Sequence, residues 1–477
     1  MLLKQQQWRR KAQLSITAAA CLLLFVLIHR QHIGHLRRHD HQKSFIGPLG
    51  PLKIEHKQNP LANPLQTSCR DLPGATSIFV LLKTSAATAH AALPIHLSTT
   101  LRCIPHFALY SDLADTILGH PILDALAPLP ASAHTNPDLA LHAEQQAWRA
   151  QALNASALAA AAGNATRAAA LDRWKPLPLL AHALATAPAA ADWFLLLDAD
   201  AAAGLLWRNL LAWVAALDPT QPVYAGAQTW WGDDDAPFAR AGAGVLLSRP
   251  AVAALAAALE SEPDAYVSWP RAGAAADHVL GLALGAVGVE LSLAWPVLQG
   301  EAPWSLDYGW GVWCRPVVSW GRMDAFWVRK MWEFERVWNA GGFLGEEDGE
   351  EPEELREVRP IRHGDIFEHF VAPHVLKVRE RRNWDNLSPD VVRYGQDGEA
   401  LVDKNGCWRA CEEREECLQW LWIADGTCRT ATVVRLGEKA EEVDMEGVWM
   451  TSGWMGSRIE RMMEEMRECE NEDWTEE

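Results

Sequence analysis

The sequence predicts a layered α/β domain over about residues 66–345, because strand-like and helix-like segments alternate along it. Short apolar runs, each followed by polar residues, predict buried strands at 77–82, 107–110, 192–198 and 244–247. Helical spacing at 205–217 follows one of these strands, and Pro250 stands where proline favours the start of a helix. This alternation favours a sheet covered by helices on both faces, an α/β/α arrangement.

Between residues 130 and 191 the sequence is dominated by alanine. Alanine is the strongest helix former, so this stretch is expected to be helical instead of disordered. Two Asn-x-Ser/Thr sequons, at Asn154 and Asn164, fall within it and are expected to lie in glycosylated loops.

The composition limits the classes of protein to which the chain can belong. Of its 477 residues, 49% are hydrophobic, which is enough apolar material to bury a sizeable core. The net charge of −18 argues against a nucleic-acid partner, since phosphate binding requires a basic surface. Much of the acidity lies in 346–354 and in the tail 441–477, and both are expected to be solvated.

Residues 12–28 (AQLSITAAACLLLFVLI) form a largely apolar segment behind a basic tail at 1–11. The segment is slightly shorter than the ~20 residues that span a bilayer comfortably, and a cleaved signal peptide is the alternative. No small-x-small cleavage site follows Ile28, so an uncleaved transmembrane anchor is favoured. Residues 29–66 are polar and dotted with proline and glycine, and are expected to form a stem.

The orientation of this anchor must come from the residues that follow it, because the charges on its two sides balance. The sequons and the clustered downstream cysteines make sense only in a secretory lumen. We therefore expect a single-pass type II membrane protein, with residues 1–11 in the cytosol and the bulk of the chain in the lumen.

Four cysteines in the segment 407–428 (CWRACEEREECLQWLWIADGTC) define a predicted module at 395–440: Cys407, Cys411, Cys417 and Cys428. A zinc site needs four convergent ligands, and the second pair lacks a tight C-x-x-C spacing. In a lumenal protein, two disulfides are favoured instead. Residues 346–394 before the module are expected to form an acidic linker and an extension of the preceding domain.

The cysteine spacing is similar to that of PAN or apple modules, in which two cysteines one helical turn apart are tied to a following hairpin. This similarity implies the pairs Cys407–Cys428 and Cys411–Cys417, and a module that binds sugars or proteins. A purely structural appendage is the alternative. Elsewhere, Cys69–Cys103 is a looser expectation, while Cys314 and Cys469 have no expected partner.

Two carboxylates stand where the predicted strand at 192–198 runs out into a loop: Asp198 and Asp200 in DWFLLLDAD. A pair of this kind suits a hard divalent cation that carries a diphosphate. Such a cation neutralises the charge that builds as a sugar–phosphate bond breaks. The competing interpretation is a turn or a helix cap, because acidic residues are common after strands.

Several further motifs accompany this pair: SIFVLLKTSAATAHAALPIHLSTTLRCIPHFALYSD from Ser77, then FARAGAGVLLSRP, DHVLG and WCRPVVS. In this order and spacing they resemble fungal members of glycosyltransferase family 31, the inverting β-1,3-glycosyltransferases that include Fringe and core-1 galactosyltransferase relatives. The resemblance covers residues 77 to about 337. It implies a GT-A-like catalytic domain at 67–345 that uses Mn²⁺ or Mg²⁺ and a UDP-sugar donor, with galactose as the favoured sugar. It also implies a glycan or glycoprotein acceptor of O-GalNAc type and a location in the Golgi membrane.

The resemblance also implies roles for individual carboxylates. Asp198 and Asp200 match the metal-binding positions, with more weight on Asp200. Asp277, in a D-x-V-x-G element, matches the base that takes a proton from the acceptor hydroxyl. The alternative is that Asp277 caps a helix at 277–286, since aspartate is a favoured N-cap residue, and the two roles can coexist.

Six residues are expected to contact the donor sugar, phosphate or nucleoside. Gly242 and Gly244 in RAGAGVLLS allow close backbone approach to a bound ligand, although a tight turn would also explain them. Polar residues that follow the first two predicted strands are candidate uridine and ribose contacts, because open α/β sheets bind ligands beyond the carboxyl ends of their strands: Lys83, Thr84, Ser111 and Asp112.

One departure from the family pattern stands after WCRPVVS, where Gly321 and Arg322 replace an expected pair of histidines. Neither residue can coordinate a cation, so a metal would rest on Asp200, the diphosphate and water. Alternatively, Arg322 binds the diphosphate directly, with guanidinium charge in place of metal charge. A decayed site is the third possibility, and it leaves a second function class: a relative that binds glycans or proteins without catalysis.

Overall fold

The computed structural model describes residues 69–150, 165–199, 204–232, 236–273, 275–340, 359–393, 403–440, 449–469 and 474. The chain divides into two units, Met1–Ile54 and Glu55–Glu477, and every described residue belongs to the second. The predicted anchor at 12–28, both sequons and Asp200 therefore lie outside the described residues. Among the helices that are described, none is both long enough and apolar enough to cross a bilayer.

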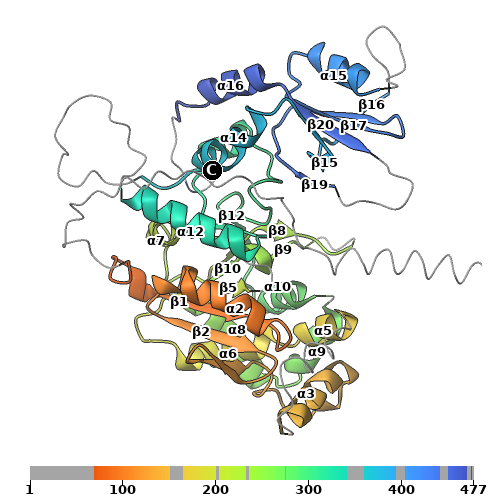
Figure 1. The fold of residues 1–477 in the computed structure, drawn as a ribbon. Helices are drawn as coiled ribbons and strands as arrows, with labels where there is room; N and C mark the ends of the chain where they lie inside the picture. Colours follow the sequence, from red (N-terminus) through yellow and green to blue (C-terminus); the bar gives the residue numbers. More distant parts are fainter. Residues whose placement is uncertain are drawn as a thin grey trace, which may run out of the picture. The chain divides into compact units, whose positions relative to one another are not determined.

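An eight-stranded mixed sheet forms the centre of the N-terminal region (Figure 1), with strand order β11-β7-β10-β5-β1-β2-β4-β3. Its strands are β1 Ile78–Lys83, β2 Phe107–Ser111, β3 Asp115–Ile117, β4 His120–Asp124, β5 Trp193–Asp198, β7 Tyr224–Gly226, β10 Val245–Ser248 and β11 Leu291–Leu293. Strand β1 is parallel to both of its neighbours, β2 and β5, whereas β10 is antiparallel to β5. The four strands expected from apolar runs are confirmed.

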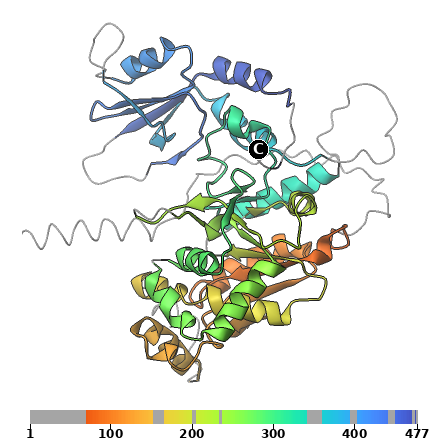
Figure 2. The ribbon, with the colours of Figure 1, turned by 180° about the vertical axis from the view of Figure 1, so that it is seen from behind.

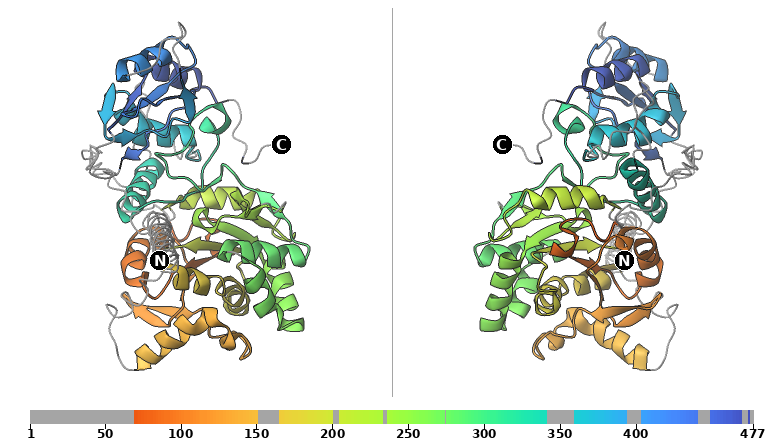
Figure 3. Two further views of the ribbon diagram at one scale, coloured as in Figure 1. Left: turned by 90° about the vertical axis from the view of Figure 1, so that its right-hand side faces the viewer. Right: turned by 90° about the vertical axis from the view of Figure 1, so that its left-hand side faces the viewer.

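Helices cover both faces of this sheet, as the α/β/α expectation required. One core packs β1 through Leu82 against α2 (Ala89–Ser98) and α7 (Trp207–Ala215). The other packs β1 through Leu81 against α6 (Pro176–Thr186), α8 (Arg249–Ser261) and α10 (Ala276–Ala286). Figure 1 shows the face that carries α2, Figure 2 shows the opposite face, and the side views of Figure 3 show helices on both sides. Every residue of β1 is buried because helices cover both faces of the sheet at this strand.

Within the described residues, most of the alanine-rich stretch is helical, in α3 (Ala140–Ala150), α5 (Ala165–Asp172) and α6, with turns and short 3-10 helices between and around them. The helix expected at Pro250 is α8, and the Ser248 side chain accepts the backbone N–H of Ala251 at its start. The remaining elements of this region are η1 Ala75–Ser77, η2 Thr100–Arg102, η3 Ala133–Thr135, η4 Pro137–Leu139, β6 Gly204–Leu205, β8 Gln228–Thr229, β9 Phe238–Ala239, η5 Ala241–Ala243, α9 Ala265–Ala272, β12 Leu298–Gln299, α11 Trp310–Trp313, β13 Ser319–Trp320 and α12 Ala325–Asn339.

The C-terminal region contains a five-stranded antiparallel sheet, order β14-β20-β17-β18-β16, with α15 (Lys404–Glu412) packed on β17. Its strands are β14 Glu380–Arg382, β16 Asp390–Val392, β17 Gln419–Ile423, β18 Cys428–Ala431 and β20 Met450–Trp454. The sheet therefore extends beyond the expected boundaries of 395–440 on both sides. Around it lie α13 His363–Ile366, the π-helical η6 Phe367–Val371, α14 Ala372–Val375, β15 Trp384–Asp385, β19 Glu438–Lys439 and α16 Gly456–Glu465.

Four disulfides join the described cysteines. The pairs Cys407–Cys428 and Cys411–Cys417 are confirmed, and they tie α15 to β18 and to the loop that follows the helix. The looser expectation of Cys69–Cys103 is confirmed as well. Cys314 and Cys469, for which no partner was expected, are bonded to each other across 155 residues.

Candidate functional site

Charged residues meet at the carboxyl ends of β1 and β5. Lys83 and Asp198 are the last residues of these two parallel strands and are paired in register. The Lys83 Nζ lies 2.9 Å from Asp198 Oδ2 and 2.6 Å from Asp172 Oδ2. The chain runs from β1 to β2 on one side of β1, and later adds β5 on the other side of β1. The strand order therefore reverses at β1, and open α/β sheets bind ligands at such a reversal.

The pairing continues inward through a second lysine. Lys175 Nζ lies 3.1 Å from Asp172 Oδ1 and 3.2 Å from Asp112 Oδ1, and it donates a hydrogen bond to the Thr84 carbonyl. Five alternating charges therefore form one chain, called here the buried charge chain: Asp198, Lys83, Asp172, Lys175 and Asp112. Gln145 Nε2 and the backbone N–H of Ala86 donate to Asp112 at its inner end.

Pairing in this chain outweighs the effect of burial on the pKa values of Asp172 and Lys83. Burial opposes ionisation of Asp172, yet attraction to Lys83 and Lys175 outweighs it and holds the pKa of Asp172 well below its usual range. Burial likewise works against the charge of Lys83, but the carboxylates of Asp172 and Asp198 raise its pKa well above the ordinary value.

The four expected nucleoside contacts gather at these strand ends, but the structure gives their side chains other partners. Lys83 and Asp112 belong to the buried charge chain, and Ser111 Oγ lies 3.3 Å from Asp112 Oδ1. Thr84 Oγ1 lies 3.2 Å from Thr88 Oγ1. All four are buried, with 3% of the residue exposed at most. Direct contact with a donor stays a prediction, and the geometry assigns them a role in supporting the strand ends.

Asp277 lies in the first turn of α10 and faces the same cluster. Its Oδ2 accepts the backbone N–H of Ala241 at 2.9 Å, from the loop that precedes β10. The alternative interpretation, that Asp277 caps its own helix, is wrong, because the N-cap residue is Ala275 and it makes no side-chain cap hydrogen bond. Beside it, the His278 ring stacks on Phe238 with centroids 4.9 Å apart.

The environment of Asp277 favours the protonated form more than water does. Burial raises the pKa of Asp277 to about 6, the Lys83 ammonium and the Ala241 N–H oppose that rise, and the Asp198 and Asp172 carboxylates add to it. The interaction with Lys83 and Asp198 places Asp277 within electrostatic reach of the strand ends. Its side chain is only partly buried, so it keeps access to solvent.

Three glycine-containing loops meet beside Asp277. Gly244, with φ of +97°, ends η5 immediately before β10, and a Cβ there would lie 3.1 Å from Leu197. A Cβ at Gly321 would lie 2.8 Å from the Gly300 carbonyl oxygen and 3.1 Å from that of Gly242. These contacts leave no room for a histidine at position 321, so placing the side chain that the resemblance leads one to expect there would require the backbone to move.

Arg322 follows this glycine with φ of +56° and points toward Glu301. Its Nη1 donates to Glu301 Oε2 at 3.2 Å, and Arg240 Nη1 lies 3.6 Å from the other carboxylate oxygen. Arg240 immediately precedes Ala241, whose N–H binds Asp277. Two guanidinium groups thus share one carboxylate, and one of them belongs to the residue before Ala241, whose N–H orients the candidate base.

The described residues do not complete a metal site. Asp198 Oδ2 is paired with Lys83, and Gly321 and Arg322 supply no ligand. Within the described ranges, no three His, Cys, Asp or Glu side chains converge to hold a metal ion. A cation at this site therefore depends on Asp200, which lies outside those ranges.

Sequence reasoning missed Asp172, Lys175, Arg240 and Glu301. Asp172 and Lys175 could have been suspected as charges in an alanine-rich stretch, directly before the helix-starting Pro176. His96 on α2 was missed too: its ring is buried near the Ala199 backbone, and burial lowers its pKa to about 4, opposed by that backbone and by Asp198.

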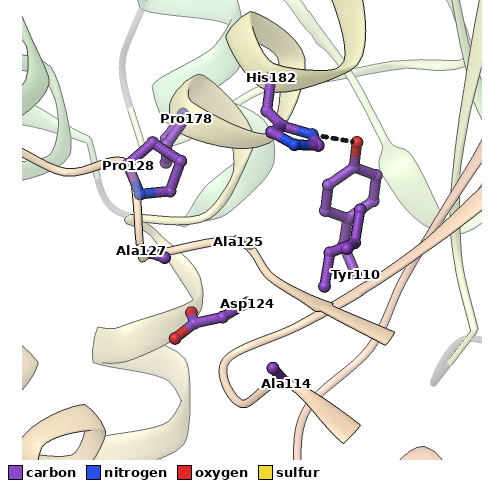
Figure 4. Close-up of a pocket in the computed structure, with 9 residues that line it drawn as sticks. Tyr110, Ala114, Asp124, Ala125, Ala127, Pro128, Pro178 and His182 are labelled. Carbon is purple, nitrogen blue, oxygen red and sulfur yellow. Dashed lines mark hydrogen bonds between the residues drawn. The ribbon is translucent and has the colours of Figure 1, made fainter. Parts of the chain in front are cut away.

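A hollow of about 280 Å³ lies elsewhere, between β2, β4 and α6, and it includes none of the candidate catalytic side chains. Figure 4 shows Tyr110 and His182 facing each other on one side, with Pro128 and Pro178 close together on the other. The Tyr110 hydroxyl lies 3.0 Å from His182 Nδ1. Its walls are mostly apolar, and the charged groups described above lie at the strand ends instead.

Neither a scan against protein-family models nor a search of curated proteins found a match to this chain. The resemblance to glycosyltransferase family 31 thus rests on the quoted motifs, and function has to be inferred from the geometry of the site.

Proposed function

We propose that the α/β region is an inverting β-1,3-glycosyltransferase with a GT-A-like arrangement. It moves a sugar, with galactose favoured, from a UDP-sugar to a hydroxyl of a glycan or glycoprotein, with O-GalNAc-type glycans as the favoured acceptor. The reversal in strand order at β1 and β5 supports the location of the donor, because open α/β sheets bind nucleotides at this position.

The observation that carries the proposal is the environment of Asp277. A general base works best when its pKa lies near the operating pH, and burial raises the pKa of Asp277 to about 6. The Ala241 N–H occupies one of its oxygens at 2.9 Å and fixes the orientation of the carboxylate. Asp277 is thus a carboxylate that is held in place beside the strand ends yet still accessible.

In the proposed reaction, the acceptor hydroxyl attacks the anomeric carbon from the side opposite the diphosphate. The new bond from oxygen to carbon forms as the sugar–phosphate bond breaks, and UDP leaves with the bonding electron pair. Asp277 takes the hydroxyl proton during this step. Mn²⁺ or Mg²⁺, if Asp200 holds it, would neutralise charge on the leaving diphosphate.

An exposed aromatic pair supports an acceptor surface next to this base. Trp230 and Trp231 follow β8, and the strand pair places Thr229 opposite Phe238, whose ring stacks on His278. The two tryptophans are 55% and 52% exposed, and exposed aromatic groups beside a site often mark ligand contacts. We include them in the proposal as contacts for the apolar face of an acceptor sugar.

The proposal includes a Golgi-lumenal location behind the anchor at 12–28. The four disulfides among the described cysteines support it, since such bonds persist in the secretory pathway and are rare in the cytosol. The cysteine module remains a candidate for binding glycans or proteins.

A transfer assay with UDP-galactose and an aryl α-GalNAc acceptor, with and without Mn²⁺, tests the proposal. Asp277→Asn should reduce transfer by roughly 10²- to 10⁴-fold, because an amide cannot take the proton, and should leave UDP binding nearly unchanged. Asp264→Asn is the matched control, since it makes the same change at an exposed aspartate beside α9. Equal transfer by Asp277→Asn would refute the role of Asp277, and absence of UDP binding by the wild type would favour a non-catalytic binding protein.

A further inference from the structure

The arginine pair, Arg240 and Arg322, lies on two loops that are far apart in sequence. Arg240 links β9 to η5, and Arg322 follows β13. Both approach Glu301, on the loop after β12, at 3.6 and 3.2 Å. Three separate segments therefore bring two cations and one anion to one place, with a net charge of +1.

These loops also border the strand ends where a donor would bind. The first residue of β10 pairs with Leu196, so η5, directly before β10, lies at the end of β5 that carries Asp198. In the same segment, the backbone N–H of Ala241 donates a hydrogen bond to Asp277. The arginine pair is thus anchored to the backbone that orients the candidate base.

The walls beside the arginine pair are bare backbone. Gly321 lies against the carbonyl groups of Gly300 and Gly242, so no side chain fits there. A Cβ at Gly300 would lie 3.2 Å from Arg240 Cδ, so the arginine stem covers this glycine. Because residues 300 and 321 are glycines, the charged side chains that the structure brings together here are Arg240, Arg322 and Glu301.

The ion pairs in this cluster are of the kind that exchange easily. The side chains of Arg240, Glu301 and Arg322 are 37%, 38% and 52% exposed, and exposed ion pairs contribute little to stability. A phosphate group matches the planar fork of a guanidinium group at least as well as a carboxylate does. An arriving dianion can therefore take both arginines from Glu301 at small cost.

We propose that Arg240 and Arg322 form a clamp for the diphosphate of a nucleotide, and that Glu301 holds the two arginines in place when no ligand is bound. The clamp supplies the positive charge that the missing histidine ligand would have supplied through a metal. The inference rests on the proposed function, because it assigns the donor's diphosphate to that same site.

Calorimetric titration of the full-length chain with UDP in EDTA tests the clamp directly, and inorganic pyrophosphate serves as a second probe. Loss of a charge-assisted hydrogen bond should weaken UDP binding by roughly tenfold or more in Arg240→Ala and in Arg322→Ala. Arg240→Lys keeps the charge but loses the planar fork, so it should fall between the wild type and Arg240→Ala. Glu301→Gln removes the competing anion and should tighten binding several-fold.

Arg167→Ala is the matched control, because Arg167 pairs with Glu144 in a similarly exposed ion pair away from the strand ends. Its UDP affinity should equal that of the wild type. Unchanged UDP affinity in Arg240→Ala and Glu301→Gln, in a preparation that still transfers sugar, would overturn the clamp and leave the transferase proposal standing. UDP binding that needs Mn²⁺ would also overturn the clamp as a replacement for metal. A wild type that binds UDP under neither condition would refute both proposals.

Discussion

The buried charge chain and the arginine pair lie at the same candidate site, but they hold their charges in opposite ways. Lys83 and Lys175 are 3% and 2% exposed in their side chains and have partners at 2.6–3.2 Å, whereas Arg240 and Arg322 are 37% and 52% exposed. A buried charge without a partner is costly, so the first group must stay paired for the chain to fold. An exposed charge exchanges one partner for another, so the second group is suited to a ligand.

The largest effect that tests this contrast is expected at Lys83. Lys83→Met leaves the carboxylates of Asp172 and Asp198 without their shared cation, and breaking a buried pair in this way costs about 3–5 kcal/mol. The free energy of unfolding, measured by urea denaturation at neutral pH, should fall by that amount. Lys404→Met, which breaks an exposed pair with Glu380, should cost no more than about 1 kcal/mol. Equal losses in the two variants would show that the buried charge chain is not a structural requirement.

An intermediate effect is expected at Asp277, where substitution should raise the free energy of unfolding instead of lowering it. Its pKa is about 6 in the folded chain against an ordinary value of 3.8, so the folded state binds the proton more tightly. This tighter proton binding contributes fully to the free energy of unfolding below about pH 4, and the contribution is lost as the pH rises through 6. Asp277→Asn avoids the loss and should be about 2–3 kcal/mol more stable than the wild type at pH 8.

The difference at Asp277 should vanish below about pH 4, where the aspartate is protonated in both states. Urea denaturation across this pH range measures it, with Asp264→Asn as the variant that should show no such trend. A variant that is less stable than the wild type at pH 8 would contradict the assigned environment. Together with loss of transfer, the predicted gain would mark Asp277 as a residue kept for function at the expense of stability.

The smallest effect is expected at Glu301. Glu301→Gln removes two exposed ion pairs, and pairs of this kind contribute about 0–1 kcal/mol each at most. Its free energy of unfolding should therefore stay within about 2 kcal/mol of the wild type, while its affinity for UDP increases. A loss comparable to that of Lys83→Met would show that the arginine pair is part of the structural framework as well.

The sequence predicted the parts of this site that have a local signature. The apolar runs that end at Lys83 and Asp198 became β1 and β5, since buried strands need continuous apolar residues. The contacts of Asp172 with Lys83 and of Cys314 with Cys469 join residues 89 and 155 positions apart. Such contacts depend on how the elements pack, and no periodicity or motif in one sequence encodes them. The helix-cap interpretation of Asp277 failed for the same reason, because its partner is Ala241 on another loop.

The Cys314–Cys469 bond has a consequence for the integrity of the molecule. It closes a covalent ring around every residue from 314 to 469, which includes α12, the whole antiparallel sheet and both inner disulfides. A ring of this size removes enough freedom from the unfolded chain to be worth about 5 kcal/mol. A single protease nick anywhere inside it releases no fragment, so a nicked molecule would migrate as one species until a reductant opened the ring. The cysteine module and the α/β region are therefore covalently inseparable under oxidising conditions, even when the backbone between them is broken.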